Sequence, residues 1–312
     1  MSVERSCAGA VVGAMGETMH WTDGFIAVDW GTTNRRGYRI DSSGHCVDEF
    51  EDGEGILSVP AGGFPAAVAE IRDRLGDMPL LLAGMVGSNR GWAEAPYVPC
   101  PASLDDLAKG VVRVGEREAI VPGIKDDANG RADVMRGEEV QLLGAIAEGQ
   151  VDPDALVCHP GTHNKWVIVR KGEIESFRTV MTGELFNLLK ENSILSDLLA
   201  GAVAVGDPFR EGVRVGLTNQ DLPAELFSVR ARVLLDKAKR EDAASFASGL
   251  LIGTDVRIGL SYPTSAQVTV MGRPELTRLY AAAIEAAGRP VREIDGERCF
   301  LAGIQEIAKR IS

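Results

Sequence analysis

The sequence predicts a two-lobed α/β protein, and three observations support this prediction. A length of 312 residues allows one large domain or two lobes that each bury their own core. Strand-like and helix-like segments alternate between residues 25 and 86, which is typical of an α/β lobe. A glycine turn with its following hairpin occurs at Gly31 and again at Gly161, and a repeat at domain length indicates two similarly built lobes.

Composition and charge exclude several classes of protein. Hydrophobic residues make up 45% and charged residues 25% of the chain, as in an ordinary folded protein. The net charge of −12 makes nucleic acid an unfavourable partner, although a local basic pocket for a small anion stays compatible with it. No apolar run approaches the roughly 20 residues that cross a bilayer. Five scattered cysteines without a C-x-x-C pair favour reduced thiols and a cytoplasmic location.

The first lobe is expected over residues 23–149, after a loosely ordered tail at 1–22. Residues 25–30 form an apolar strand that ends at Gly31, and residues 36–40 and 46–50 continue it as a three-stranded meander. A helix is expected at 64–75, because apolar side chains recur there at helical spacing. A buried strand at 79–86 then ends in a polar turn at 87–89.

The second lobe is expected over residues 150–312, because Gly149 and the residues after it resemble a linker. Its apolar run at 156–158, its glycine turn and its strands at 165–169 and 173–177 repeat the layout of the first meander. A helix between the two lobes begins at Glu138, with acidic residues in its first turn. Further elements are expected as a helix at 182–200, a strand at 268–272 and a last helix at 304–311, which packs back on the first lobe.

The turn after the first strand is suited to phosphate. Gly31 keeps bulky side chains away, so successive backbone N–H groups are exposed, and the hydroxyls of Thr32 and Thr33 add donors. Asp29 repels a phosphate but is able to hold Mg²⁺ that bridges to one. Taken alone, the segment favours an ordinary hairpin turn capped by Asp and Thr, because turns use these residues anyway.

The second turn favours the functional interpretation of both turns. Gly161, Thr162 and His163 repeat the pattern, and Lys165 adds a positive charge for a phosphate oxygen. Two equivalent turns from two lobes are able to hold one polyphosphate from both sides, which predicts a nucleotide between the lobes. A metal site built on Cys158, His159 and His163 is a weaker alternative, because zinc prefers four closely spaced ligands.

Five blocks of sequence resemble one known family. Residues 26–34, 83–92, 133–139, 160–166 and 178–185 are similar to the 2-dehydro-3-deoxygalactonokinases, within the actin, hexokinase and Hsp70 superfamily. The resemblance implies two ribonuclease-H-like lobes of the actin-like ATPase and sugar kinase fold, with a nucleotide cleft between them. It also implies ATP and Mg²⁺ as cofactors, and phosphorylation of a small sugar acid, 2-dehydro-3-deoxy-D-galactonate, on its 6-hydroxyl in D-galactonate breakdown.

The resemblance also implies roles for particular residues. The first phosphate motif falls on Asp29, Gly31, Thr32 and Thr33, the second on Gly161, Thr162 and His163, and the adenosine motif on Gly272. An acidic residue at the start of the interlobe helix accepts the proton of the attacking hydroxyl in related sugar kinases. Glu138 matches that place best, Asp133 is a rival, and a helix-capping carboxylate is the structural alternative for Glu138.

The substrate has a carboxylate and several hydroxyls, which require Arg, amide and hydroxyl groups. The polar turn after the strand at 79–86 offers such donors at a strand end, where open α/β sheets bind ligands. Arg90 and Trp92 are also compatible with a surface loop whose ring packs down. The substrate-binding candidates are Ser88, Asn89, Arg90, Trp92, Arg136 and Glu184.

Other functions are also compatible with the two phosphate turns. A kinase for another sugar acid, or an exopolyphosphatase, would use the same turns and differ only in the acceptor. An ATP-driven binding module of the Hsp70 or actin type would need a peptide-binding domain or polymerising inserts, for which this chain has no spare length. The sequence leaves the oligomeric state open, a homodimer included.

Overall fold

The computed structural model describes residues 21–262 and 267–311. Most of the expected N-terminal tail therefore lies outside the described residues. Its predicted end at residue 22 is wrong, because residues Trp21–Asp23 form a short 3₁₀ helix, η1. Trp21 is only 2% exposed and meets Phe25 edge-on at 6.0 Å. Burying a tryptophan ring stabilises the fold, so the ordered first lobe begins before Phe25.

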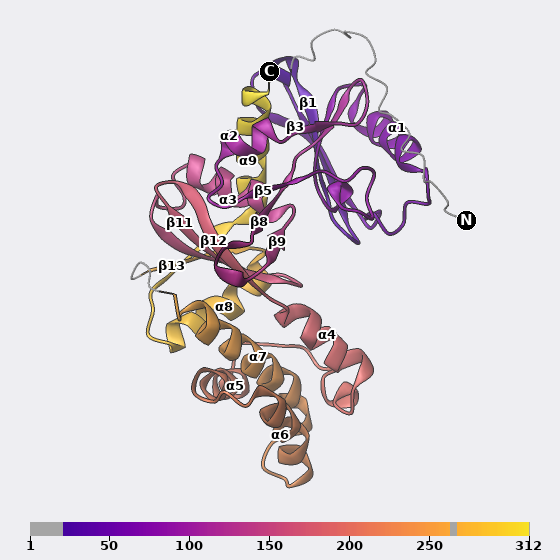
Figure 1. The fold of residues 1–312 in the computed structure, drawn as a ribbon. Coiled ribbons are helices and arrows are strands. Elements are labelled where there is room, and N and C mark those ends of the chain that lie inside the picture. The colour runs from indigo at the N-terminus through magenta and orange to yellow at the C-terminus, as the bar shows by residue number, and fades with distance from the viewer. Residues whose placement is uncertain (1–20, 263–266, 312) are drawn as a thin grey trace, which may run out of the picture.

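The first lobe is built on a six-stranded sheet (Figure 1). The predicted meander is confirmed as β1 (Phe25–Trp30), β2 (Arg35–Ile40) and β3 (Cys46–Asp52). β4 (Leu80–Gly84) pairs parallel to β1, and β7 (Glu118–Ile120) and β6 (Val112–Arg113) complete the order β3-β2-β1-β4-β7-β6. The predicted helix is α1 (Phe64–Leu75), whose apolar side chains pack on one face of the sheet.

Smaller elements connect this sheet to the middle of the chain. They are η2 (Met85–Gly87), α2 (Leu104–Lys109), η3 (Ala128–Gly130) and a three-stranded sheet of β5 (Tyr97–Pro99), β8 (Gly123–Asp126) and β9 (Asp133–Met135). α3 (Glu138–Ala147) follows β9 and is the predicted interlobe helix.

The second lobe repeats the strand order of the first. Its sheet contains β10 (Ala155–His159), β11 (Asn164–Arg170), β12 (Glu173–Val180), β13 (Val268–Gly272) and β14 (Val291–Asp295), in the order β12-β11-β10-β13-β14. In both sheets the second strand is antiparallel to the first and the fourth is parallel to it. This is the ribonuclease-H-like arrangement, so the repeated glycine turns belong to equivalent places in two equivalent sheets.

The helices of the second lobe form an arm that extends away from the first lobe (Figure 1). They are α4 (Thr182–Asn192), η4 (Ser196–Leu198), α5 (Asp207–Thr218), α6 (Leu222–Leu234), η5 (Arg240–Asp242), α7 (Ala243–Gly259) and α8 (Pro274–Ala286). The helix predicted at 182–200 ends early, because the Ser193 hydroxyl donates to Leu189 O and accepts from the Leu195 N–H. α5 and α7 approach through glycines: a Cβ on Gly216 would lie 2.3 Å from Leu250 O.

The last helix, α9 (Gly296–Arg310), begins eight residues before the predicted 304, because the Asp295 side chain caps it at the Glu297 N–H (2.8 Å). It lies along α3, where a Cβ on Gly144 would lie 2.1 Å from Cys299 O. Side chains of α3 and α9 belong to one buried cluster that includes residues of both sheets. The C-terminal end of α9 lies beside the first lobe (Figure 1). None of the described helices is both long and apolar enough to span a membrane.

Candidate active site

A cleft of about 510 Å³ lies between the two lobes and receives residues from both glycine turns. A volume of this size is ordinary for a small-molecule site. The first lobe contributes Asp29, Gly31, Asn34, Arg36 and Glu51; the interlobe helix contributes Gln141; the second lobe contributes His159, Pro160, Gly161, Thr162, Gly272, Arg273, Pro274, Leu276, Asp295, Gly296 and Glu297.

The first turn is closed on itself and held from behind. The Gly31 N–H donates to Asn34 O (2.9 Å), which closes the turn. The carbonyl groups of Gly31, Thr32 and Thr33 accept hydrogen bonds from backbone N–H groups of residues 55–57, at 3.0 to 3.2 Å. Both threonine side chains are exposed. The turn is therefore rigid on the side of the protein and open on the side of solvent.

Asp29 is the last residue but one of β1 and is opposite Arg36 in the β1–β2 register. Burial raises the pKa of the Asp29 carboxyl to about 6; Arg36 opposes this rise, and the negative charge of Glu138 adds to it. The carboxylate is thus short of positive charge in this structure. A cation in the cleft would relieve that deficit.

The second turn lies at the junction of two hollows. Gly161 and Thr162 line the cleft and also line an apolar hollow of about 290 Å³ between α4, α7 and α8. Leu276 is shared by both hollows as well, so the two are continuous. His163 is about half exposed and its Nε2 bonds the Glu184 carboxylate at the start of α4.

A buried carboxylate anchors this turn. Asp255 on α7 is fully buried and accepts hydrogen bonds from Asn164 Nδ2 (3.0 Å), Trp166 Nε1 (2.7 Å), Tyr280 OH (2.6 Å) and Thr182 Oγ1 (2.5 Å). Burial raises its pKa, and these four donors oppose the rise. Asn164 ends the turn and Thr182 begins α4, so Asp255 fixes both. Sequence reasoning missed it, although Asp255 is one of only two charged residues in an otherwise apolar α7.

The cysteine and histidines near this turn do not assemble a metal centre. Cys158 Sγ contacts Asn164 Oδ1 at 3.4 Å, and His159 Nε2 contacts Gln141 Oε1 at 2.8 Å. Burial lowers the pKa of His159, so the ring is neutral at pH 7. Within residues 21–262 and 267–311, no group of three or more His, Cys, Asp or Glu side chains has the spacing of a metal site.

Glu138 begins α3 beneath the cleft. It follows Gly137, whose φ of +110° and close approach to Gly84 leave no room for a side chain. Its Oε1 lies 3.3 Å from Lys165 Nζ, and its Oε2 accepts the Arg136 N–H at 3.1 Å. Burial acts to raise the pKa of Glu138, but the charge of Lys165, together with His159 and hydrogen bonds to the carboxylate, holds the pKa below its ordinary value. Glu138 is therefore an ionised carboxylate at neutral pH.

Asp133, the rival candidate, ties two strands together. Its carboxylate accepts the Thr179 N–H (2.7 Å) and the Thr179 hydroxyl (2.6 Å), which joins β9 to β12. Both oxygens are thus already engaged in a contact between the lobes. This arrangement gives Asp133 a structural task and leaves Glu138 as the better placed acceptor.

The loop after β4 lies next to the start of α3. Ser88 is 6% exposed and its hydroxyl donates to Met85 O (2.7 Å), whereas Asn89 and Arg90 are exposed. The Trp92 ring stacks parallel to Phe64 at 6.2 Å and packs on the core of the first lobe. This packing agrees with the alternative interpretation of Trp92, in which it belongs to a surface loop and its ring packs on the core.

Arg136 is the most unusual side chain of this region. It is 8% exposed, donates from Nη2 to Ala95 O (2.8 Å) and lies over the Tyr97 ring at 4.3 Å. Its Nε and Nη1 are buried and have no hydrogen-bond partner among the residues that the structure describes. Leaving buried guanidinium donors unpaired costs more than a neutral group would, so this site is suited to an anionic ligand.

Glu139 is a buried acid beside the candidate base. It is fully buried, and both of its oxygens accept the Gly137 N–H, at 2.8 and 2.7 Å. Burial and the charge of Glu138 raise its pKa from 4.5 to about 8. The folded protein thus holds a proton at pH 7 that the unfolded chain releases.

We expect Glu139→Gln to remove a pH dependence of stability. Because the pKa of Glu139 is raised in the folded state, the free energy of unfolding falls as pH rises from about 4.5 to about 8. Asp29 contributes in the same direction only up to about pH 6. Melting temperatures between pH 6 and 8 should fall by several degrees in the parent chain and stay nearly level in the variant.

The matched control is Glu275→Gln, which changes an exposed glutamate in the first turn of α8. It should leave the slope of melting temperature against pH unchanged. An equal slope in parent and Glu139→Gln chains would show that Glu139 is ionised in the fold.

Several residues that line the cleft were not identified from the sequence. Gln141 lies three residues after Glu138, hence on the same face of α3, and that spacing could have identified it. Arg36 could have been found from the hairpin register opposite Asp29. Glu51 Oε1 bridges Arg36 (3.2 Å) and Arg273 (2.7 Å) across the two lobes, and no local pattern indicates this contact.

Two ribonuclease-H-like lobes around a shared cleft, with a carboxylate at the start of the interlobe helix, define the actin-like ATPase and sugar kinase fold. Comparison with known proteins identifies the family. The model of the 2-keto-3-deoxy-galactonokinase family matches residues 29–307, and the chain belongs to this family.

Two curated relatives and one solved structure extend over nearly the whole chain. The 2-dehydro-3-deoxygalactonokinase of Escherichia coli K12 is 36% identical over 291 residues, covering 92% of this chain and 98% of the relative. DgoK1 of Rhizobium meliloti, assigned the same activity, is 35% identical over 302 residues, covering 92% and 97%. A crystal structure of a Sinorhizobium meliloti protein assigned to this activity is 34% identical, with a TM-score of 0.86 over 92% of this chain and 99% of that one.

Proposed function

We propose that this chain transfers the terminal phosphoryl group of ATP to the 6-hydroxyl of 2-dehydro-3-deoxy-D-galactonate, a step of D-galactonate breakdown. Membership of the kinase family supports the reaction type and the substrate class. One structural observation supports it above the others: the glycine turns of both lobes line a single cleft. Scattered free cysteines and the use of ATP fit a cytoplasmic enzyme.

The triphosphate is proposed to lie between the turns at Gly31 and Gly161. Backbone N–H groups and the hydroxyls of Thr32, Thr33 and Thr162 are its donors. Arg36 and Arg273 lie at the same cleft and supply positive charge. The adenine is proposed to enter the apolar hollow past Gly161, where Gly183, Leu279 and Tyr280 provide flat and apolar contacts.

The residues present fit a magnesium ion bound with the nucleotide. Mg²⁺ usually keeps water and phosphate ligands and needs only one or two carboxylates. Asp29 offers one carboxylate, whose pKa is raised by burial that the nearby Arg36 and Arg273 only partly offset. Bound there, the ion would neutralise charge on the phosphates during transfer.

Glu138 is proposed as the base. Its ionised carboxylate accepts a hydrogen bond from the 6-hydroxyl and aims that oxygen at the γ-phosphorus. The O6–P bond forms as the bond to the ADP oxygen breaks, and the hydroxyl proton passes to Glu138. Lys165, paired with Glu138 at 3.3 Å, is proposed to keep it ionised and to fix its position, rather than to contact phosphate as its residue type first indicated.

Arg136 is proposed to bind the carboxylate of the sugar acid. Its Nε and Nη1 are unpaired, and each is able to donate a charge-assisted hydrogen bond to a carboxylate. The loop at Ser88, Asn89 and Arg90 lies close by and is proposed to contact the hydroxyls. Glu184 and His163, which bond one another, would close the other side of the cleft.

A panel of acceptors tests the proposal. ADP release is measured with no acceptor, with 2-dehydro-3-deoxy-D-galactonate, with its C4 epimer, with D-galactonate and with galactose. We expect fast release only with 2-keto-3-deoxy acids. Equal ADP release without any acceptor would instead indicate an ATP-driven module. Preference for another acid would support the assignment as a kinase but change the assigned substrate.

Asp29→Asn should mainly weaken the response to magnesium. We expect the Mg²⁺ concentration for half-maximal rate to rise by about 10- to 100-fold, because the carboxylate that holds the ion is lost. Since burial raises the pKa of Asp29 to about 6, kcat/KM for MgATP should fall as pH drops through 6 in the parent chain. An unchanged Mg²⁺ titration in the variant would remove Asp29 from this role.

A further inference from the structure

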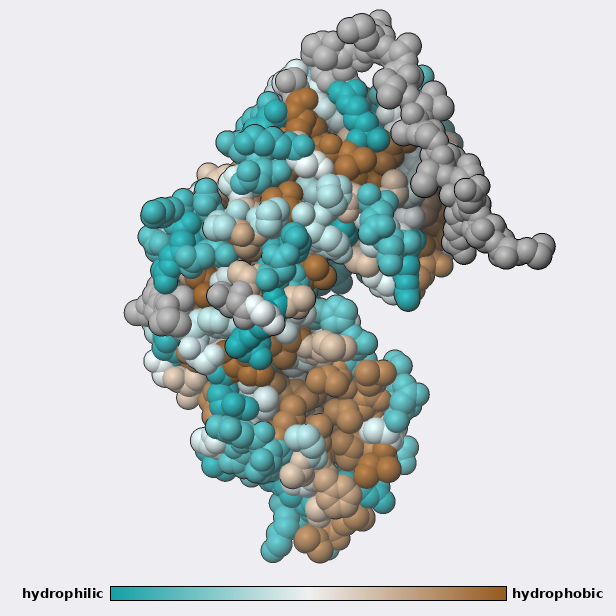
Figure 2. Space-filling view, viewed as in Figure 1, coloured by the Kyte–Doolittle hydropathy of each residue, from teal (hydrophilic) through white to brown (hydrophobic). Residues whose placement is uncertain are grey.

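We propose that a second copy of this chain docks on the exposed apolar surface of the helical arm. We define this arm surface by six side chains: Leu185, Leu188, Ile194, Phe227, Leu234 and Leu235. The last four are between 59% and 68% exposed. Figure 2 shows hydrophobic residues gathered over the helices at the lower end of the molecule. The proposal is independent of the kinase activity.

The six side chains belong to one surface of neighbouring helices. Phe186 and Leu189 on the inner side of α4 share a buried cluster with Val229 and Val233 of α6. The outer side chains keep helical spacing, since Leu185 and Leu188 are three residues apart and Phe227 and Leu234 seven apart. Arg230 Nη1 donates to Ile194 O (3.4 Å) and joins α6 to the segment after α4.

The area is large for an uncovered surface and fits a dimer. A fully exposed aromatic side chain presents roughly 200 Å² and a leucine or isoleucine less, so the six expose on the order of 600 Å² together. The largest apolar patch of a monomeric protein is usually about 300–600 Å². A stable pair buries about 800 Å² on each partner, and the half-buried Leu222 and Leu226 extend the surface towards that value.

The net charge of the chain limits how a second copy is able to dock. Each chain carries a net charge of −12, so two copies repel one another, and burial of apolar area has to outweigh that repulsion. A two-fold axis through the arm would place the apolar groups of one copy against the same apolar groups of the other. Closing of the first lobe would not cover the side chains of α6, because α6 is at the far end of the arm from it (Figure 1).

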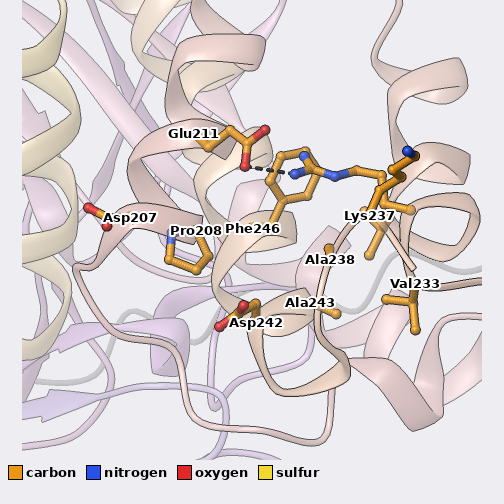
Figure 3. Close-up of a pocket in the computed structure, with 11 residues that line it drawn as sticks. Asp207, Pro208, Glu211, Val233, Lys237, Ala238, Asp242, Ala243 and Phe246 are labelled. Carbon is orange, nitrogen blue, oxygen red and sulfur yellow. Dashed lines mark hydrogen bonds and ion pairs between the residues drawn. The ribbon is translucent and has the colours of Figure 1, made fainter. Parts of the chain in front are cut away.

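The arm also offers a recess for a protruding side chain. A hollow of about 290 Å³ between α5, α6 and α7 is lined by Val229, Val233 and Phe246 (Figure 3). Part of its polar edge is neutralised, because Arg232 pairs with Glu211 at 2.7 Å and lies over the Phe246 ring, and Asp207, Lys237 and Asp242 complete that edge. Recesses beside exposed Phe and Leu side chains are typical of interfaces in which each partner inserts an anchor.

Molar mass in solution tests this proposal. The full chain is measured by light scattering after size exclusion, between about 1 and 100 µM. We expect twice the 33.3 kDa of one chain for the parent, and 33.3 kDa for Phe227→Glu combined with Leu234→Glu. Both sites are exposed, so the variant should keep the parent's near-ultraviolet circular dichroism, which reports its fold.

The matched control is Val47→Glu, a 54% exposed apolar residue on β3 of the first lobe. It should keep the mass of the parent. If the double variant does not fold, the single change Leu234→Lys is measured in its place, with the same expectation. A parent mass of 33.3 kDa at every concentration, or a well-folded arm variant with the parent's doubled mass, would overturn the proposal.

Discussion

Replacing Glu138 by Gln lowers kcat by about 10³-fold, the middle of the range for loss of a general base, while ATP affinity changes by less than a factor of about three. Gln keeps the shape of the side chain but accepts no proton and attracts Lys165 less strongly. Turnover is measured by ADP release at saturating sugar acid, and ATP affinity by titration calorimetry with a non-hydrolysable analogue. The two numbers separate chemistry from binding.

The rival acid supplies the control for this experiment. Asp133→Asn removes the bonds to Thr179 and should lower stability more than turnover. Because Glu138→Gln leaves the buried Lys165 without its ion-pair partner, its melting temperature is measured as well. Normal turnover in folded Glu138→Gln, together with a large loss in Asp133→Asn, would exchange the two roles.

Arg136→Gln is the second change with a large expected effect. The guanidinium is proposed to give charge-assisted hydrogen bonds to the substrate carboxylate, each contributing about 1.5–3 kcal/mol. Their loss should lower kcat/KM for the sugar acid by about 10²- to 10³-fold. KM for ATP should stay near its parent value, because the nucleotide is proposed to bind at the glycine turns and not at Arg136.

A neighbouring arginine provides the comparison. Arg90→Gln changes an exposed side chain of the adjacent loop and should reduce kcat/KM by less than about tenfold. If the unpaired donors of Arg136 are satisfied by water and not by substrate, Arg136→Gln will alter the melting temperature and leave kcat/KM for the acid intact. That outcome would move the carboxylate site elsewhere.

The strands and turns of the fold could be predicted because their causes are local. Apolar runs that stop at Gly31 and Gly161 depend only on adjacent residues, and the structure has β1 and β10 at those places. The spacing of Val68, Ile71 and Leu75 likewise predicted α1 without knowledge of the sheet. The interlobe helix was found because its acidic first turn is also a local feature.

The remaining elements depend on contacts that the sequence does not display. α7 is apolar on nearly every side, so it has no periodic stripe, and it packs on α5 through glycines on both helices. The first half of α9 was missed because Asp295, and not an apolar pattern, sets its start. Trp21 was placed in a tail because its partner Phe25 is revealed only by the fold.

Lys165 shows the same limit within the site. A lysine after a glycine turn suggests phosphate by residue type alone. The β10–β11 register pairs Lys165 with His159, and the fold brings Glu138 from the interlobe helix to within 3.3 Å of its ammonium group. This long-range contact is the reason to expect that Lys165 interacts with Glu138, the candidate base, and not with phosphate.

A crystal structure with a non-hydrolysable ATP analogue and the sugar acid would test the central idea most directly. We expect the analogue's phosphates to accept hydrogen bonds from both bends, near Gly31 and near Gly161, with the acid's 6-hydroxyl against Glu138. An analogue bound by one lobe alone, or outside the space between the lobes, would contradict it.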